Sequence, residues 1–422
     1  MVFFQIFLRK NKELFKNIDL IKVAKLLFYG AIFTLPFQIS TIISQPEIYL
    51  SGQSNHFNNA TLYLTDILII LSAVFFFPVK SKIEIGDKIM FFTLIALGIL
   101  IFILNIKSDI FPIYWLVFRL LTFAITYLLL VNRIATKESL YKVLLLAGSI
   151  QAIIAIMQFT NQRSIGLEML GEPNLSASNI AKIDVNDTKM IRSYGTMPHP
   201  NVLAGLLTIA IILGAKFKRW MPFLGLCTIG IVLTFSRSAI LALATCAILF
   251  ALFNTKSLIV FCKKHYLISL TTILLIATMG FFTYPTLKSH LLSTYEINER
   301  FEQLPIAISV IEENFLGIGW QNYTNLIQKY TENKIDPWEY QPVHNIYLLA
   351  TSELGIIGIA LILFMLFYTT VSTKDKYIKY AIIAVCIIGL FDHYPYTLYQ
   401  GQLLTIILLS LSLSKDIRPE KI

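Results

Sequence analysis

The chain has 422 residues, of which 56% are hydrophobic and only 14% are charged. Because soluble globular domains carry about 25% charged residues, this composition excludes a water-soluble globular protein. The formal net charge of +10 could indicate nucleic-acid binding, but the basic residues concentrate in short loops between apolar runs. That distribution is typical of membrane orientation, so we expect membrane lipids around the chain and no nucleic-acid partner.

Apolar runs of membrane-spanning length follow one another along the chain. A bilayer core of about 30 Å needs roughly 20 apolar residues per helix. The sequence therefore predicts an all-α polytopic membrane protein, a single membrane domain over 1–422, with about twelve transmembrane helices. The candidate spans are 24–43, 62–79, 88–105, 111–131, 140–159, 200–215, 220–234, 238–253, 266–284, 343–370, 378–391 and 399–414.

Clusters of Lys and Arg occur in every second loop between these spans. Under the positive-inside rule those loops lie in the cytoplasm, so both termini are predicted to be cytoplasmic. The basic N-terminal segment lacks a small-residue cleavage site, and we interpret it as a start-transfer anchor rather than a removed signal peptide.

Two of the predicted exterior loops are long, 160–199 and 285–342. The second is longer than a connector needs to be but too small for a separate domain. We expect it to contain short helices and to cap a cavity among the membrane helices. Four side chains in it follow the helical spacing i, i+3, i+4, i+7: Tyr323, Leu326, Ile327 and Tyr330.

One histidine and three arginines on the predicted exterior side could carry chemistry. His344 opens a predicted span, and histidine is the default general base near neutral pH, although an interfacial histidine at a helix start is an equally simple interpretation. Arginine offers a permanently charged, planar fork suited to phosphate, or to ion pairs with neighbouring glutamates. Arg237 lies in an especially tight apolar hairpin, where a charge needs protein, water or an anion beside it. The other two arginines are Arg192 and Arg300.

A further pair of charged residues lies inside predicted spans. Arg119 sits in the middle of its span, and Glu353 lies nine residues into another. Charges at membrane depth usually face a cavity or a partner, so these two residues could pair with each other or contact substrate. The sequence shows no metal-ligand spacing and no glycine-rich nucleotide loop, so we predict neither a metal nor a cofactor.

Four segments together resemble the bacterial O-antigen ligase and Wzy-type O-antigen polymerase superfamily of membrane glycan transferases. The strongest consists of His344-Asn345, nine residues, Gly355, two residues and Gly358, at the end of the large exterior loop. Three weaker segments occur in the family's order: Arg192-Ser193-Tyr194-Gly195-Thr196 with His199-Pro200-Asn201; Thr234-Phe235-Ser236-Arg237-Ser238-Ala239; and Arg300 followed by Phe315-Leu316-Gly317-Ile318-Gly319-Trp320.

The resemblance implies a GT-C-like helical fold in the bacterial cytoplasmic membrane, with its active site on the periplasmic or extracellular face. It implies transfer of a glycan from an undecaprenyl-diphosphate carrier to a hydroxyl of an acceptor glycan, lipid or protein, with inversion and without a metal. His344 would be the base, and Arg192 and Arg300 would bind the diphosphate. The remaining candidate substrate contacts are Arg237, His199, Asn345, Arg119 and Glu353.

Two other functions remain open from the sequence alone. A transporter or flippase of polysaccharide intermediates would be expected to show internal repeats and broken helices in both halves, and no such repeat is visible. A non-catalytic component of an envelope assembly complex would need no exterior base beside an arginine cluster.

Overall fold

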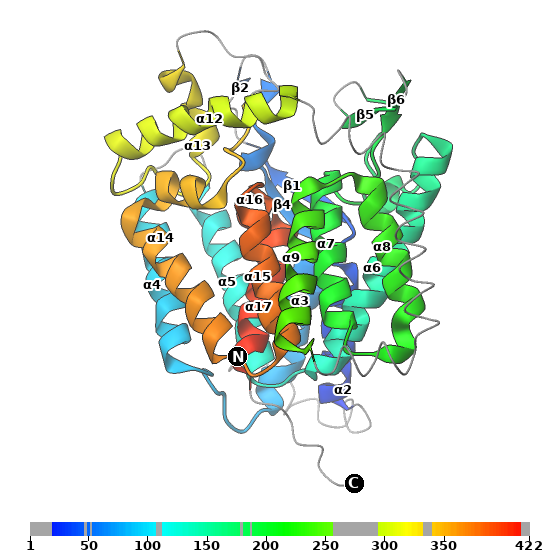
Figure 1. Cartoon of the computed structure of the whole chain (residues 1–422). Coiled ribbons are helices and arrows are strands. Elements are labelled where there is room, and N and C mark those ends of the chain that lie inside the picture. The colour runs from blue at the N-terminus through cyan, green and yellow to red at the C-terminus, as the bar shows by residue number, and fades with distance from the viewer. Residues whose placement is uncertain are drawn as a thin grey trace.

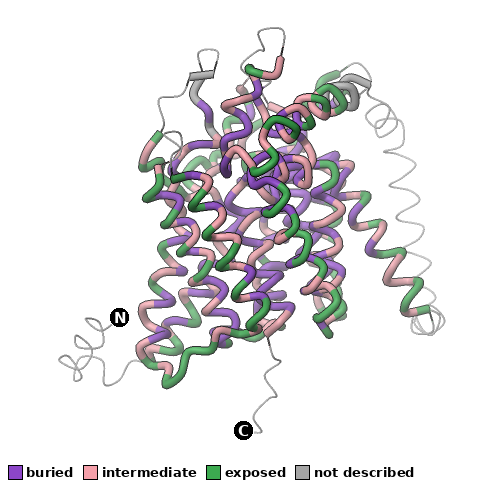
Figure 2. Tube along the Cα trace, turned by 90° about the vertical axis from the view of Figure 1, so that its left-hand side faces the viewer, coloured by how far each residue is buried: buried purple, intermediate pink, exposed green. Residues whose placement is uncertain are grey.

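The computed structural model describes residues 19–45, 49–50, 53–106, 112–177, 180–185, 188–255, 294–331 and 340–414. Long helices form a bundle, and the short helices and small strand pairs gather at one end of it (Figure 1). Buried residues concentrate on the inner faces of the helices (Figure 2), while many large apolar side chains remain exposed on the outer faces. Exposed apolar side chains around a bundle are what a lipid environment favours.

Each predicted span except 266–284, which lies outside the described residues, corresponds to a helix of the bundle. By length and composition, four of the described helices could cross a membrane, namely α4, α5, α6 and α14. The helical membrane fold is therefore confirmed, and the number of crossings stays a prediction. The long helices are α2 (Leu20–Thr34), α3 (Leu64–Phe76), α4 (Lys88–Asn105), α5 (Ile113–Val131), α6 (Lys137–Asn161), α7 (Pro200–Gly214), α8 (Met221–Thr234), α9 (Arg237–Phe253), α14 (Ile346–Ser372), α15 (Lys376–Gly389) and α17 (Tyr399–Leu413).

The predicted span 24–43 is too long at its carboxyl end. Helix α2 ends at Thr34, and the chain then forms β1 (Ser40–Ser44), which pairs antiparallel with β4 (Ala60–Tyr63). Pro36 cannot continue a helix because it has no backbone N–H, and the β-branched residues that follow it favour an extended chain. Apolar content alone could not distinguish this strand from the end of a span.

The segments at the predicted exterior end add one helix of 20 residues, α12, where only short helices were expected, together with two short helices and two more strand pairs. Tyr323 and Ile327 are buried against α12 and α14, so the predicted spacing in the large loop does mark a short helix, continued by a 3₁₀ turn over Ile327–Tyr330. Figure 1 shows α12 and α13 lying across the end of the bundle near α14. The elements are β2 (Tyr49–Leu50), β3 (Gln53–Ser54), β5 (Lys182–Val185), β6 (Thr188–Ile191), α12 (Thr294–Glu313), α13 (Tyr323–Leu326) and α16 (Tyr394–Thr397).

Loops that were predicted to share a side of the membrane lie together in the fold. Between two predicted cytoplasmic loops, Lys216 Nζ lies 3.0 Å from a carboxylate oxygen of Glu138. Between two predicted exterior segments, Asn55 Nδ2 donates to Thr324 Oγ1 over 2.8 Å. These two contacts agree with the charge pattern, while the membrane topology and the end that faces the cytoplasm stay predictions.

Helix α7 is the central helix of this arrangement. All its residues except Ile211 are buried, and it packs against α6, α8, α9 and α15. At Gly205 the helix meets the Tyr394 side chain so closely that an added Cβ would lie 1.6 Å from the phenolic oxygen, so only glycine fits there. The N-terminal end of α7 therefore lies at the centre of the bundle, directly beside α16.

A kink in α14 at Gly355 is the place where the two glycine motifs of the sequence meet: Gly355 with Gly358, and Gly317 with Gly319. Gly355 has φ 68° inside α14, a left-handed conformation that favours glycine. The Gly317 turn packs against this kink, where Ile356 N–H donates to the Phe315 carbonyl over 3.2 Å and Gly319 N–H donates to the Glu353 carbonyl over 2.8 Å. Backbone hydrogen bonds on both sides of Gly355, which is ten residues after Asn345, thus fix the large exterior loop to α14.

Candidate active site

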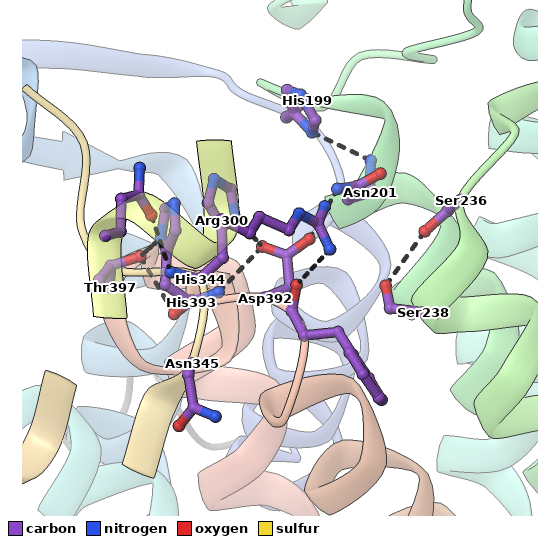
Figure 3. A network of polar contacts seen from close by, with 12 residues as sticks. His199, Asn201, Ser236, Ser238, Arg300, His344, Asn345, Asp392, His393 and Thr397 are labelled. Atoms are coloured by element: carbon purple, nitrogen blue, oxygen red, sulfur yellow. Dashed lines mark hydrogen bonds and ion pairs between the residues drawn. The ribbon is translucent and has the colours of Figure 1, made fainter. Parts of the chain in front are cut away.

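A line of polar side chains crosses the outer end of α7 and ends at the loop between α15 and α16 (Figure 3). Arg192 donates from Nε to the Thr234 carbonyl and from Nη2 to Asn201 Oδ1, both over 2.7 Å. Asn201 Nδ2 in turn donates to Asp392 Oδ2 over 2.6 Å. Because all of these side chains are buried, their mutual hydrogen bonds hold each in one orientation.

His344 lies at the far end of this line. Its Nδ1 is 3.9 Å from Asp392 Oδ1, and its side chain keeps 17% of its surface exposed. The neighbouring residue Asn345 is the N-cap of α14, where its Oδ1 accepts hydrogen bonds from the first backbone N–H groups of the helix. This cap fixes the start of α14 and therefore the position of His344. A substrate contact by Asn345 stays a prediction.

Arg300, in the large exterior loop, also lies beside the loop between α15 and α16. It lies in α12, and its Nη1 donates to the carbonyl oxygen of Phe391 over 3.0 Å. Phe391 directly precedes Asp392, so the structure brings the predicted residues Arg192, Arg300 and His344 together around one short loop. The family resemblance had implied that these three residues share one site, although their spacing in the sequence does not show it.

Asp392 carries a negative charge in this cluster. Burial, the largest single influence, raises the pKa of its carboxyl, whereas the imidazoles of His344 and His393, when protonated, lower it. His199 and Arg300 act in the same direction, so the pKa of Asp392 lies below its ordinary value. At neutral pH the carboxylate is therefore available to orient a neighbouring imidazole.

The other two imidazoles of the cluster are held neutral. Burial lowers the pKa of His199 to about 3, with Arg192 adding to the effect, and burial together with His344 lowers the pKa of His393 to about 3. His199 is the N-cap of α7, and its Nδ1 accepts from the Asn201 N–H over 3.2 Å. His393 Nδ1 lies 2.8 Å from Thr397 Oγ1. Both are engaged in fixing the fold, which leaves the partly exposed His344 as the imidazole best placed for proton transfer.

Arg237 opens α9 immediately after a tight turn. Phe235 has φ 52°, Ser236 is the N-cap, and the Thr234 carbonyl just before them accepts the hydrogen bond from Arg192. The turn therefore lies beside the cluster, as its motif predicts. That the Arg237 side chain contacts substrate stays a prediction.

The predicted pairing of Arg119 with Glu353 is wrong. Arg119 Nη1 lies 2.8 Å from Asp66 Oδ1, its Nη2 donates to the Thr61 carbonyl, and its guanidinium lies 4.2 Å from the Tyr399 ring centroid. The counter-ion, Asp66, lies in the first turn of α3, directly after β4. The positions of the predicted spans did not indicate that this segment lies beside Arg119 of α5.

Glu353 has a different environment from the one predicted. Its Oε1 accepts the backbone N–H of Tyr323 over 3.2 Å, at the junction between α14 and the exterior loop. Arg119 and Glu353 each have a structural partner, and a substrate contact by either stays a prediction.

One possible metal-ligand set occurs in the described part of the chain. His344, Asp392 and His393 each offer one ligand atom, and these atoms lie within 4.8 Å of one another. Two imidazoles and a carboxylate are suitable ligands for a divalent ion, although His393 Nδ1 and both carboxylate oxygens of Asp392 also have protein partners. The expected absence of a metal remains a prediction.

Asp392 is the site residue that sequence reasoning missed. It lies in Phe391-Asp392-His393, a short exterior connection between two apolar helices. A charge in such a tight apolar connection is costly unless it has a partner, and the same argument had singled out Arg237. If this argument is applied to every short connection of the chain, it identifies Asp392 as a candidate site residue.

The fold and this cluster define a helical membrane protein with a histidine, a carboxylate and arginines gathered at one end of its bundle. Residues 222–363 match the family model described as O-Antigen ligase, a stretch that contains Arg237, Arg300 and His344. The match confirms the family resemblance seen in the motifs. No curated protein matches the chain. The family implies a membrane enzyme of the ligase or polymerase class that acts on lipid-linked glycans in polysaccharide biosynthesis.

Proposed function

We propose that this protein transfers a glycan from an undecaprenyl-diphosphate carrier to an acceptor hydroxyl at the outer face of the bacterial cytoplasmic membrane. The observation that carries the proposal is that Arg300 and His344 lie directly against the loop 391–393, while Arg192 is connected to it through Asn201. Three residues from separate exterior segments meet at the end of a membrane bundle, where a lipid diphosphate and a sugar hydroxyl can both arrive.

His344 is the general base in this proposal. The acceptor oxygen attacks the anomeric carbon of the donor sugar and loses its proton to a neutral imidazole nitrogen. The Asp392 carboxylate, 3.9 Å from Nδ1, orients the ring and stabilises the imidazolium once the proton has moved. As the new carbon–oxygen bond forms, the bond from the anomeric carbon to the phosphate oxygen breaks, and in-line attack inverts the sugar's configuration.

Arg300 stabilises the leaving group. Undecaprenyl diphosphate gains negative charge as it departs, and a fixed guanidinium in a water-poor site stabilises that charge without a metal. Arg300 is half-buried, and its Nη1 already binds the Phe391 carbonyl, so its position relative to Asp392 and His344 is set before substrate binds.

Arg192 acts on the same site through its neighbours. Its hydrogen bond to Asn201, and the bond from Asn201 to Asp392, place the carboxylate facing His344. We therefore assign Arg192 a positioning role in addition to the diphosphate contact that the family resemblance implies. Asn201 is the link on which this role depends.

The test is transfer by the purified protein in liposomes that contain an undecaprenyl-diphosphate-linked glycan and candidate acceptors. We expect product and free undecaprenyl diphosphate from the wild type, with or without a metal chelator. Arg300→Ala should raise the donor KM or lower kcat by about tenfold or more, because a charge-assisted hydrogen bond contributes about 1.5–3 kcal/mol. Arg300→Lys should retain part of the activity, since it keeps the charge but loses the planar fork. Absence of transfer to any glycan, lipid or protein acceptor would contradict the proposal.

The identity of the acceptor distinguishes the two activities of the family, polymerase and ligase. In a strain that lacks the protein, single repeat units on the surface would indicate a polymerase. Full-length chains retained on the carrier lipid would indicate a ligase. The same strain separates both from a flippase, because loss of a flippase leaves the carrier-linked glycan on the cytoplasmic side.

A further inference from the structure

Buried oxygen atoms without partners gather where the turn 317–323, which follows α12, meets α14. Glu353 Oε2, Gln321 Oε1, Asn105 Oδ1 and the Tyr396 hydroxyl are shielded from solvent and have no hydrogen-bond partner within the described part of the chain. Buried polar atoms in native proteins are almost always hydrogen-bonded to protein, water or an ion. Four exceptions around one turn therefore indicate a bound group that supplies the missing interactions.

The four oxygens belong to separate elements that contact this turn. The Tyr323 N–H donates to the other carboxylate oxygen of Glu353 over 3.2 Å. The Tyr396 hydroxyl lies next to the same carboxyl group, but outside direct hydrogen-bonding geometry. At Gly319 an added Cβ would lie 3.1 Å from Asn105 Oδ1, so the end of α4 lies against the same turn. Polar atoms that are near each other but not bonded are typical of a site that a third group bridges.

The Glu353 carboxylate has no counter-ion among the described residues. Only 3% of the residue is exposed, and none of the ion pairs in the described ranges involves it. The arginine expected beside it, Arg119, pairs with Asp66. Because a buried carboxylate without a positive partner is strongly unfavourable, we expect a positive charge from outside the chain at this place.

Two helix ends add to the negative potential around this carboxylate. The first half of α14 stops at the kink, where Gly355 has φ 68°, and α4 ends at Asn105. Figure 1 shows α4 and α14 side by side at one edge of the bundle. The C-terminal end of a helix carries a partial negative charge and favours cations. In membrane proteins, the ends of broken helices and their freed carbonyl groups coordinate Na⁺.

We propose that Glu353, Tyr396, Gln321 and Asn105 form a binding site for a monovalent cation of the Na⁺ class. All the ligands are oxygen atoms, which select a hard cation. One carboxylate among neutral oxygens balances a single positive charge, whereas a divalent ion would leave a net charge buried. A proton on Glu353 would remove the negative charge but leave the other three oxygens without partners. A water molecule would leave the carboxylate uncompensated.

The bound cation would fasten the large exterior loop to α14. The turn 317–323 follows α12, which carries Arg300, and α14 begins directly after His344-Asn345. The site is separate from the His344-Asp392-His393 set, and its existence does not depend on the proposed function. A chelator of divalent ions would not remove its cation, so the site agrees with transfer in the presence of a chelator.

Binding of ²²Na⁺ to the purified protein in detergent tests the proposal. The wild type should bind the ion saturably, and Glu353→Gln should weaken binding by about tenfold or more, because affinity depends on the charge of the ligands. Glutamine keeps the size of the side chain and leaves no buried charge, so we expect normal folding. The matched control is Glu313→Gln, which removes an exposed carboxylate paired with Lys329 in the same exterior segment and should bind as the wild type does.

Stability gives a second measurement that does not use the radioactive ion. The Tm of the wild type and of Glu313→Gln should be higher in sodium chloride than in choline chloride at equal ionic strength, since a ligand of the folded state stabilises it. The difference should disappear in Glu353→Gln. Tyr396→Phe should weaken ²²Na⁺ binding several-fold, yet in choline it should be at least as stable as the wild type, because it loses a hydroxyl without a partner.

Three results would overturn the site. They are absence of saturable ²²Na⁺ binding to the wild type, equal binding by Glu353→Gln, and displacement of the sodium by micromolar Ca²⁺, which would show that the charge balance was misjudged. None of these measurements involves glycan transfer. Failure of the proposed function would therefore leave the sodium site standing, and failure of the sodium site would leave the proposed function untouched.

Discussion

Replacement of His344 by alanine is expected to lower kcat for glycan transfer by about 10²- to 10⁴-fold, the usual contribution of a general base. In the proposed mechanism the imidazole contacts the acceptor proton and not the diphosphate, so the KM for the donor should change little. Thermal stability should change little, because the His344 side chain is still partly exposed. The kcat and the donor KM for transfer, measured on the same preparation, check both parts.

A matched histidine substitution controls for the loss of an imidazole as such. His265 lies outside the described residues and follows Lys263-Lys264 in a loop that the charge pattern predicts to be cytoplasmic, so His265→Ala should retain wild-type transfer. Full activity of His344→Ala in a protein that inserts normally would remove His344 from the mechanism.

Asp66→Asn is expected to destabilise the protein by about 3–5 kcal/mol, because it leaves the buried Arg119 guanidinium without its counter-ion. The pair is nearly inaccessible to solvent, with 6% of the Arg119 side chain exposed and none of Asp66. Asparagine keeps the size of the side chain and an oxygen for the Tyr63 N–H, which donates to Asp66 in the native fold. The measurement is the apparent Tm in detergent.

Removal of both charges distinguishes a structural ion pair from a substrate contact. Asp66→Asn combined with Arg119→Gln should recover much of the lost Tm, since no uncompensated buried charge remains. Wild-type stability of Asp66→Asn alone, together with a large loss of donor affinity, would instead place Arg119 in the substrate site.

The helices were predictable because the bilayer imposes a length and a composition on each of them. Most predicted spans agree with the observed helices within a few residues, and α4 has the same bounds, 88–105. The error at 24–43 arose where an apolar stretch continues past Pro36 into a strand. The β5–β6 hairpin was missed because its two strands have only four residues each and lie in a segment interpreted only as a polar loop.

The site was predictable only as separate pieces. Family motifs supplied His344, Arg192 and Arg300, since each lies in a recognisable local pattern. Asp392 carried a local signal that was passed over, a charge in a tight apolar connection, but its link to Asn201 is a tertiary contact across 191 positions of the chain, which no local pattern encodes. The same limit explains Arg119, whose counter-ion Asp66 lies 53 positions away.

The central claim is that Asp392 and His344 act as one unit, and a double-mutant cycle on transfer tests it most directly. We expect Asp392→Asn and His344→Ala each to lower kcat, and the double variant to be no slower than His344→Ala alone, because the carboxylate acts through the imidazole. If the two losses multiply, the two residues work independently, and the assignment of Asp392 as the group that orients the base is contradicted.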